Sequence, residues 1–453
     1  MDALRHMPGL PRLPHTLAAP AAVILSILGA TAMPTPAQAT LGNKAIATVF
    51  AYDGQEPNRV AFTPDGSKAY VTNALSNTVS VIRTADGSQT QVIALPAGST
   101  PTNIAVSPDG AKAYVLNLGS HSISIIDTQQ DQLARPATVQ QYSGTNPYGI
   151  AFHPDPARHL AYVTNNDAAA SVSVIDTAGD KQTGTIAGYP ADQGVHGVAF
   201  SPDGTKAYAA TAQSVVVIDV AQGKKTQDVQ GYSGTTPLNL AFVSNTKLYV
   251  VNQGSGSVSI IDAAGAKQTG TVQSFKGAYP AVVATSPGGP VAYVTNYGSN
   301  SVAVIDIAHD VQSGTVDMGN FGGLRPNGLA FRPDTNPEKA GDLAYVVNNG
   351  SNSVTIVQVR AAAAVIDKIL PSSGATLGGT SVTITGSNLI DSTGVTFGGA
   401  RGTNLDVISN GELTVVTPPE SDGMPGAVDV VVQNGGGAGT APGGYTYTTV
   451  FSR

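Results

Sequence analysis

The stretch SPDGAKAYVLNLGSHSISIID, residues 107–127, contains one unit of the pattern that decides the fold. A Pro-Asp-Gly turn is followed by Ala-Tyr-Val, a bend rich in Asn and Ser, and an apolar run that ends in Asp. Related units recur seven times along the chain, and their tyrosines are Tyr70, Tyr114, Tyr162, Tyr208, Tyr249, Tyr293 and Tyr345. A period of roughly 40 to 50 residues that encodes several short strands is typical of propeller blades.

Each unit predicts three short strands and a more variable fourth. In the quoted copy the strands are residues 103–107, 112–117 and 122–127, and the Asp-Gly turn between the first two is a strong hairpin signal. The first predicted strand, residues 43–50, resembles a fourth strand with no blade before it, and the last copy lacks a fourth strand. We therefore predict that the first strand completes the seventh blade and closes the ring, which protects the terminal edges.

A small residue recurs at one site on the innermost strand of every copy. Seven sheets that converge on a narrow channel leave no room there for a larger side chain, which explains the choice of alanine. The positions are Ala61, Ala105, Ala151, Ala199, Ala241, Ala284 and Ala330.

The ends and the composition restrict the cellular setting. Residues 1–39 combine early basic residues, an apolar stretch and Ala37-Gln-Ala39, which predicts a cleaved export signal rather than a membrane anchor. The chain has no cysteine, and no later segment is apolar for long enough to span a membrane. A formal net charge of −7 gives no electrostatic reason to bind nucleic acid.

The repeats resemble a known family, the YVTN-type β-propeller proteins, over residues 43–358. Tyr70-Val-Thr-Asn73, Tyr162-Val-Thr-Asn165 and Tyr293-Val-Thr-Asn296 match its motif outright. The resemblance implies an exported or surface-associated protein, in a family of mostly undefined function whose fold is shared with lactonases.

After a linker at residues 359–365 the sequence changes character. Segments that alternate apolar and polar residues between Gly-rich turns predict a β-sandwich over residues 366–449. From Pro-Ser-Ser-Gly at 371–374 to Tyr445-Thr-Tyr447, this part resembles an IPT/TIG immunoglobulin-like domain. Its expected core is Val382, Ile384, Val395, Phe397, Val428 and Val430. The fold class is therefore all-β, a seven-bladed propeller followed by an immunoglobulin-like sandwich.

Candidate catalytic residues lie where the innermost strands begin, at the mouth of the channel. Two consecutive positions there differ between copies, so that packing symmetry does not dictate them. Arg59, Tyr148 and His196 would form a small polar site, with His196 as a general base. The same positions hold no carboxylate and one histidine, whereas a metal-dependent lactonase needs several converging ligands. We predict no metal and no cofactor, and a bland solvated rim is the simpler interpretation.

A second candidate site is a binding face on the loops that lead into the blades. Tyr among Ser, Gly and Asn is the composition of adaptable binding surfaces, although the rings would also fit between blades. The hypothesis assigns a protein or glycan partner to Tyr142, Tyr189, Tyr232, Tyr279, Asn58, Asn103, Asn239 and Asn327.

These observations predict an exported, monomeric, non-catalytic binding or adhesion protein of the cell envelope. It would be periplasmic or extracellular, with the immunoglobulin-like domain as a spacer or contact module. The alternative is a lactonase-like hydrolase or lyase with its site at His196, Arg59 and Tyr148. A passive envelope spacer is a third possibility.

Overall fold

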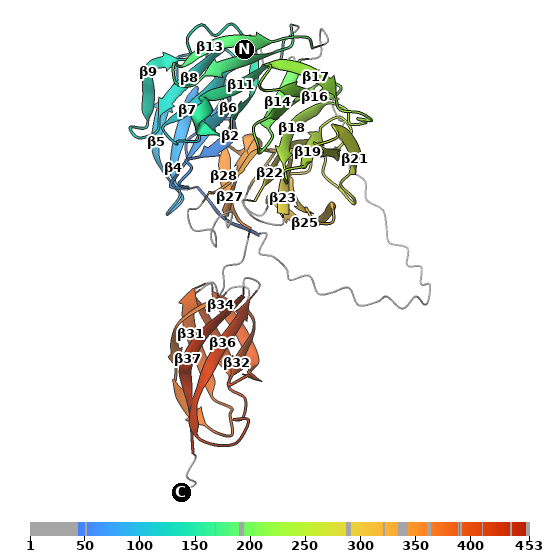
Figure 1. Ribbon diagram of the computed structural model, residues 1–453. Helices are drawn as coiled ribbons and strands as arrows, with labels where there is room; N and C mark the ends of the chain where they lie inside the picture. The colour runs from blue at the N-terminus through green and yellow to red at the C-terminus, as the bar shows by residue number, and fades with distance from the viewer. Residues whose placement is uncertain are drawn as a thin grey trace, which may run out of the picture. The chain divides into compact units, whose positions relative to one another are not determined.

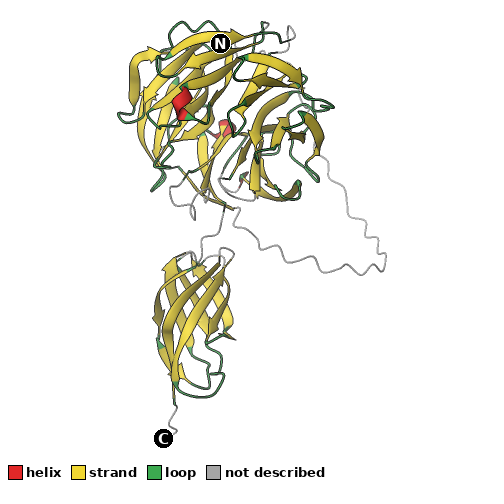
Figure 2. Cartoon of the chain, in the orientation of Figure 1, coloured by secondary structure: helices red, strands yellow, loops and turns green. Residues whose placement is uncertain are grey.

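A computed structural model describes most of the chain after its N-terminal region, and almost all of the described secondary structure is β (Figure 2). The described residues are 44–49, 52–167, 169–189, 194–286, 291–319, 322–333, 343–359, 364–387, 389, 392–409, 411–434 and 437–449. The predicted export signal and residues 360–363 of the predicted linker lie outside them. Within the described ranges, no helix has the length and apolar character that a membrane crossing requires.

The propeller consists of seven four-stranded antiparallel sheets packed around a centre, counted over the described residues (Figure 1). Six of these sheets, numbered here as blades 1 to 6, are formed by four consecutive strands whose first strand is innermost. Blade 1 contains β2 (Pro57–Phe62), β3 (Lys68–Asn73), β4 (Thr78–Arg83) and β5 (Ser88–Ala94), and blade 2 contains β6 (Pro101–Val106), β7 (Lys112–Asn117), β8 (Ser122–Asp127) and β9 (Gln132–Thr138). Blade 3 contains β10 (Pro147–Phe152), β11 (Leu160–Asn165), β12 (Ser171–Asp176) and β13 (Lys181–Ile186), and blade 4 contains β14 (Val195–Phe200), β15 (Lys206–Thr211), β16 (Val215–Asp219) and β17 (Lys224–Asp228). Blade 5 contains β18 (Pro237–Phe242), β19 (Lys247–Asn252), β20 (Ser257–Asp262) and β21 (Lys267–Thr271), and blade 6 contains β22 (Pro280–Thr285), β23 (Val291–Asn296), β24 (Ser301–Asp306) and β25 (Val311–Asp317).

Blade 7 joins the two ends of the ring. It contains β26 (Pro326–Phe331), β27 (Leu343–Asn348) and β28 (Ser353–Gln358), and its outer strand is β1 (Lys44–Thr48). β1 runs antiparallel to β28, from Lys44 opposite Gln358 to Thr48 opposite Thr355. The predicted closure by the first strand is thus confirmed. Among the described residues, the single-turn 3₁₀ helices η1 (Pro156–Arg158) and η3 (Asn349–Ser351) lie in loops of blades 3 and 7.

The recurrent tyrosines form the centre of the contacts between blades. All seven are at most 1% exposed, and each lies on the second strand of its blade. Tyr70, for example, packs with Ile104, Ala113 and Val115 of blade 2, and Ala61 lies opposite it in the register of β2 and β3. Because the alanine faces this crowded interface, a larger residue there would press on the neighbouring blade.

The C-terminal domain is a sandwich of two sheets. One contains β29 (Val365–Leu370), β31 (Ser381–Ser387), β35 (Glu412–Val416) and β34 (Thr403–Ser409); the other contains β30 (Ser373–Ala375), β37 (Gly437–Thr448), β36 (Gly426–Asn434), β32 (Ser392–Phe397) and β33 (Ala400–Arg401). The residues predicted as its core lie inside, with Val428 only partly buried. Tyr445 and Tyr447 complete the core between the sheets.

Candidate functional site

The channel mouth is narrow because the innermost strands begin side by side. Proline occupies the first position of six of these strands, and valine that of β14. A Cβ atom added to Gly149 would collide with the carbonyl oxygen of His196, and one added to Gly328 would collide with that of Asn58. Glycine at these two places therefore allows the neighbouring strands to approach.

Most polar side chains at the mouth connect one blade to the next. The amide of Asn327 donates to Asn58 Oδ1 over 2.8 Å, and the amide of Asn103 donates to the carbonyl oxygen of Tyr148 over 2.9 Å. Asn239 Oδ1 accepts from the backbone N–H of Val283 at 3.1 Å. The four predicted binding asparagines are therefore committed to the framework, at least in part. Residues that vary from blade to blade can still serve cohesion.

Arg59, Tyr148 and His196 come together at this mouth from blades 1, 3 and 4. Arg59 Nη1 donates to the carbonyl oxygens of Asn58 at 3.0 Å and Asn327 at 3.1 Å. The rings of Tyr148 and His196 have their centroids 5.2 Å apart. Arg59 and Tyr148 also interact electrostatically, so the three side chains form one cluster.

Burial determines the protonation of this cluster. Desolvation lowers the pKa of His196, opposed in part by its hydrogen bond to the carbonyl oxygen of Pro237. That bond measures 2.8 Å and involves Nδ1, which must donate because a carbonyl oxygen can only accept. Nε2 is then the acceptor of a neutral imidazole. Desolvation also raises the pKa of Tyr148 and lowers that of Arg59, although a guanidinium stays charged at neutral pH.

The cluster retains free hydrogen-bonding groups. None of the described residues forms a hydrogen bond with the Tyr148 hydroxyl, His196 Nε2 or the Nε and Nη2 groups of Arg59. Arg59 is also the one charged side chain at the second and third positions of the seven inner strands, all of which the structure describes. The site can thus offer a positive charge, a hydroxyl and a neutral imidazole to an incoming group.

Three of the four predicted binding tyrosines pack between blades instead of facing a partner. Tyr189 is 8% exposed, and Tyr142 and Tyr232 are partly buried against the interblade clusters. The Tyr142 hydroxyl donates to Asn165 Oδ1 over 2.6 Å, and that of Tyr232 donates to Asn252 Oδ1. The structure therefore differs from the predicted face built from these rings: a buried amide oxygen needs a donor, and the hydroxyls of Tyr142 and Tyr232 supply it.

Tyr279 is different, because it is 41% exposed. Tyr142 lies five residues before Pro147, and its counterpart five residues before Pro280 is Phe275. Tyr279 instead directly precedes Pro280, in a left-handed conformation. Beside it the backbone N–H of Tyr297 donates to the Tyr279 carbonyl oxygen, and the Arg325 guanidinium lies 5.7 Å from the Tyr297 ring centroid. The sequence prediction missed Tyr297 and Arg325. The signal for Arg325 was its place directly before Pro326, a position where the residue type varies between blades.

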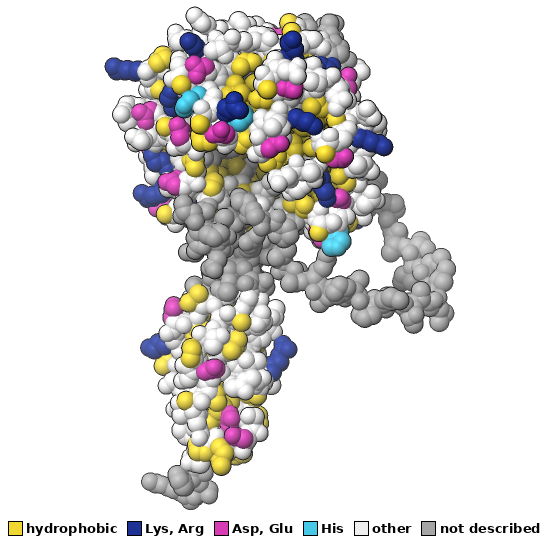
Figure 3. Space-filling model, viewed as in Figure 1, with side chains coloured by type: hydrophobic (Ala, Val, Ile, Leu, Met, Phe, Trp, Pro, Cys, Tyr) yellow, Lys and Arg dark blue, Asp and Glu magenta, His cyan; other side chains and the backbone are white. Residues whose placement is uncertain are grey.

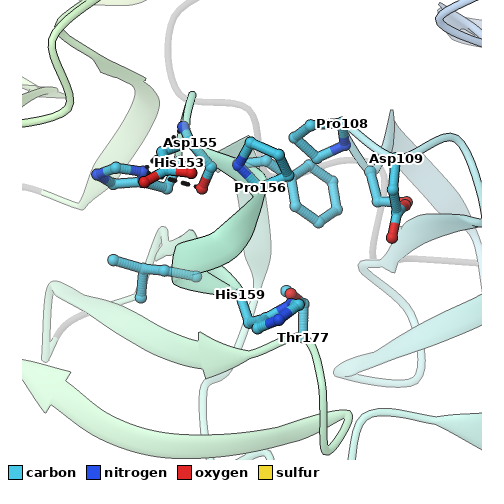
Figure 4. A pocket seen from close by; sticks show the side chains of 10 residues that line it. Pro108, Asp109, His153, Asp155, Pro156, His159 and Thr177 are labelled. Carbon is cyan, nitrogen blue, oxygen red and sulfur yellow. Dashed lines mark hydrogen bonds between the residues drawn. The ribbon is translucent and has the colours of Figure 1, made fainter.

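A separate shallow pocket lies at the other end of the inner strands, between blades 2 and 3 (Figure 4). Its buried histidine, His153, accepts at Nδ1 from the backbone N–H of Asp155 and donates from Nε2 to the carbonyl oxygen of Gly204. Asp109 accepts from the Ser107 hydroxyl at 2.6 Å. These bonds hold the hairpins, and Figure 4 shows His159 lying apart from His153. In the described part of the chain, no three His, Asp or Glu side chains gather as a metal site would require.

Comparisons with known proteins agree with this architecture. The family "Lactonase, 7-bladed beta-propeller" matches residues 36–197, 95–263 and 204–327, which together exceed half of the chain, and "IPT/TIG domain" matches residues 364–448. A search of curated proteins finds no match. Among solved structures, the chain is similar to hydrazine synthase of Kuenenia stuttgartiensis, with 23% identity, a TM-score of 0.57, and coverage of 68% of this chain and 96% of that one. At this identity the similarity shows the fold alone. The chain therefore belongs to the seven-bladed β-propeller lactonase family and carries an IPT/TIG domain after its propeller.

Proposed function

We propose that this chain is a non-catalytic binding protein of the cell envelope whose channel mouth receives an anionic group of a protein or glycan partner. The observation that carries the proposal is Arg59, a partly buried guanidinium that no described carboxylate neutralises. A desolvated arginine with free N–H groups favours carboxylate or phosphate, to which it donates paired hydrogen bonds. Tyr148 and His196 Nε2 add a hydroxyl and an acceptor at the same place.

The face around the mouth extends the surface available to a partner. Tyr279, Tyr297 and Arg325 lie on the loops that lead into the inner strands of blades 6 and 7 or on the adjacent bend. Tyrosine and arginine are the residue types enriched where proteins bind macromolecules. The leader-like residues 1–39 support export to the envelope, and the IPT/TIG domain serves as a spacer or contact module.

Hydrolysis of a lactone is the second candidate, favoured by the family match and by the open Nε2 of His196. Arg59 would then stabilise negative charge that develops on the substrate oxygen. Two features weigh against this reaction. The imidazole is oriented by a carbonyl oxygen instead of a carboxylate, and burial lowers its pKa, which makes it a weaker base.

Two measurements test the binding function and separate it from catalysis. The first is retention of the mature protein on purified envelope material, compared with Arg59→Gln and with Arg83→Gln. Arg83 is exposed and paired with Asp86 on the outside of blade 1, so its variant is a matched loss of one charge. We expect Arg59→Gln to lose retention and Arg83→Gln to keep it. The second is turnover of a lactone panel; hydrolysis that His196→Ala abolishes would replace the binding proposal with the enzyme.

A further inference from the structure

The IPT/TIG domain exposes apolar side chains at one end. Leu377 is 80% exposed and Met424 is 67% exposed, which are the largest fractions for any large apolar side chain among the described residues. Exposed prolines lie on the same loops or at the end of β29. We call this set the apolar tip: Pro371, Leu377, Pro419, Met424 and Pro425. Figure 3 shows yellow side chains at this end of the domain.

The apolar tip is held in place by the backbone. The N–H of Glu420 donates to the carbonyl oxygen of Thr376 over 2.8 Å, and that of Gly379 donates to Thr417 over 2.9 Å. A Cβ atom added to Gly378 would lie 2.5 Å from the Pro418 carbonyl carbon, so the two loops are in direct contact. The Tyr447 hydroxyl secures Pro418 from the core side at 2.7 Å. Leu377 and Met424 are thus presented on loops that are hydrogen-bonded to each other and to the sandwich.

Charge distinguishes the kinds of partner that could cover this surface. Glu420 and Asp422 lie on the same loop as Met424, and neither has an ion-pair partner among the described residues. The only basic residues between positions 364 and 449 are Lys368 and Arg401, on β29 and β33. An anionic lipid surface would be repelled, and a second copy of the tip would bring carboxylates together.

We propose that the apolar tip is a docking site for a protein partner that offers an apolar pocket bordered by lysine or arginine. Leu377 and Met424 would fill the pocket, and Glu420 and Asp422 would face the basic rim. Large apolar patches on a soluble domain mark interaction sites, and complementary charges at the rim determine orientation and partner choice. This site is independent of the channel mouth, so the chain would hold two partners, one on each domain.

The test uses the full mature protein and two synthetic peptides, each with the same Leu and Phe anchors but flanked either by lysines or by glutamates. We expect the Lys-flanked peptide to bind at least tenfold more tightly in a biolayer interferometry titration. Leu377→Ser should weaken that binding at least tenfold. Ile408→Ser, a matched change on β34 of the same domain where the side chain is 57% exposed, should not. The double variant Glu420→Lys and Asp422→Lys should prefer the Glu-flanked peptide.

The other occupants give distinct results. Equal affinity for the two peptides, or no binding of either, would overturn the proposal. Retention on vesicles of phosphatidylcholine and phosphatidylglycerol that Leu377→Ser abolishes would assign the tip to a membrane. A concentration-dependent dimer that the same variant abolishes would assign it to a second copy of the chain. Thermal unfolding of each variant checks that the domain remains folded.

Discussion

Lys112 of blade 2 and Asp180 of blade 3 form an ion pair of 2.7 Å, and the Tyr114 hydroxyl donates to the second oxygen of the same carboxylate. Asp180 lies in the turn between the third and fourth strands, in a left-handed conformation with φ of 50°. One carboxylate thus receives two donors from the preceding blade. The same arrangement joins Lys68 and Tyr70 to Asp131, and Lys247 and Tyr249 to Asp310.

At two of the contacts between blades, the lysine and the aspartate are both replaced. Where leucine replaces the lysine, the turn of the next blade has glycine in place of the aspartate: Leu160 with Gly223, and Leu343 with Gly87. Lys206 is the exception, because the corresponding turn residue is Ala266. Among the described residues, Lys206 Nζ reaches only the carbonyl oxygen of Ala263, at 3.5 Å, to which the Tyr208 hydroxyl also donates.

Ala266→Asp should therefore stabilise the propeller. The new carboxylate would meet Lys206 and Tyr208, and aspartate tolerates the left-handed conformation, φ of 48°, better than alanine does. We expect a gain of about 1 kcal/mol in the free energy of unfolding. Chemical denaturation measures it, and Ala266→Asn, of similar shape but uncharged, is the control. An aspartate variant no more stable than the asparagine variant would show that the ion pair contributes nothing.

Ala151→Leu should destabilise the propeller by overpacking. Ala151 packs beside Tyr162, Val198 and Phe200, where blades 3 and 4 meet close to the axis. Extra methylene groups in such a contact cost roughly 1–3 kcal/mol. An unchanged thermal unfolding curve would contradict the position assigned to this alanine.

Stability should fall on acidification through His196. Its folded pKa lies below the ordinary value of 6.5 because burial disfavours the imidazolium. Between that value and the lower folded pKa, the unfolded chain binds more protons than the folded chain, so the free energy of unfolding decreases as pH falls. Denaturation midpoints measured from pH 7.5 to pH 5 should show this decrease. His196→Gln should reduce the slope, and an identical slope in both proteins would show that the histidine does not contribute.

The sequence was sufficient to predict the blades, the closure by β1 and the sandwich core, because each rests on repetition or alternation. It also singled out Arg59, Tyr148 and His196, which the structure brings together at the mouth. The role of Tyr142 could not be predicted in this way. Its hydroxyl is required by the buried oxygen of Asn165, more than twenty residues away, and only the folded register shows that the two meet.

The same pairing of a tyrosine hydroxyl with an asparagine oxygen explains why some buried polar atoms lack a hydrogen-bond partner. In blade 4 the place of the asparagine is taken by Thr211, and the Tyr189 hydroxyl is buried without a hydrogen bond from any described residue. In blades 2, 6 and 7 the asparagines are present as Asn117, Asn296 and Asn348, but no described tyrosine hydroxyl reaches them, and their Oδ1 atoms are unpaired within the described structure. The tyrosine and the asparagine therefore act as a structural pair, which repeats imperfectly around the ring.

We expect the groups shared between blades to provide cohesion and the free groups at the mouth to bind the proposed partner. Two substitutions test this division of roles. Tyr142→Phe removes a hydroxyl from an interblade pair, and Tyr148→Phe removes one from the mouth. Both variants are compared with the unsubstituted protein for thermal unfolding and for retention on envelope material. Tyr142→Phe should lower stability by on the order of 1 kcal/mol and retain binding, whereas Tyr148→Phe should unfold like the unsubstituted protein and bind more weakly. The reverse pattern, or loss of binding in Tyr142→Phe alone, would contradict this division of roles between the two hydroxyls.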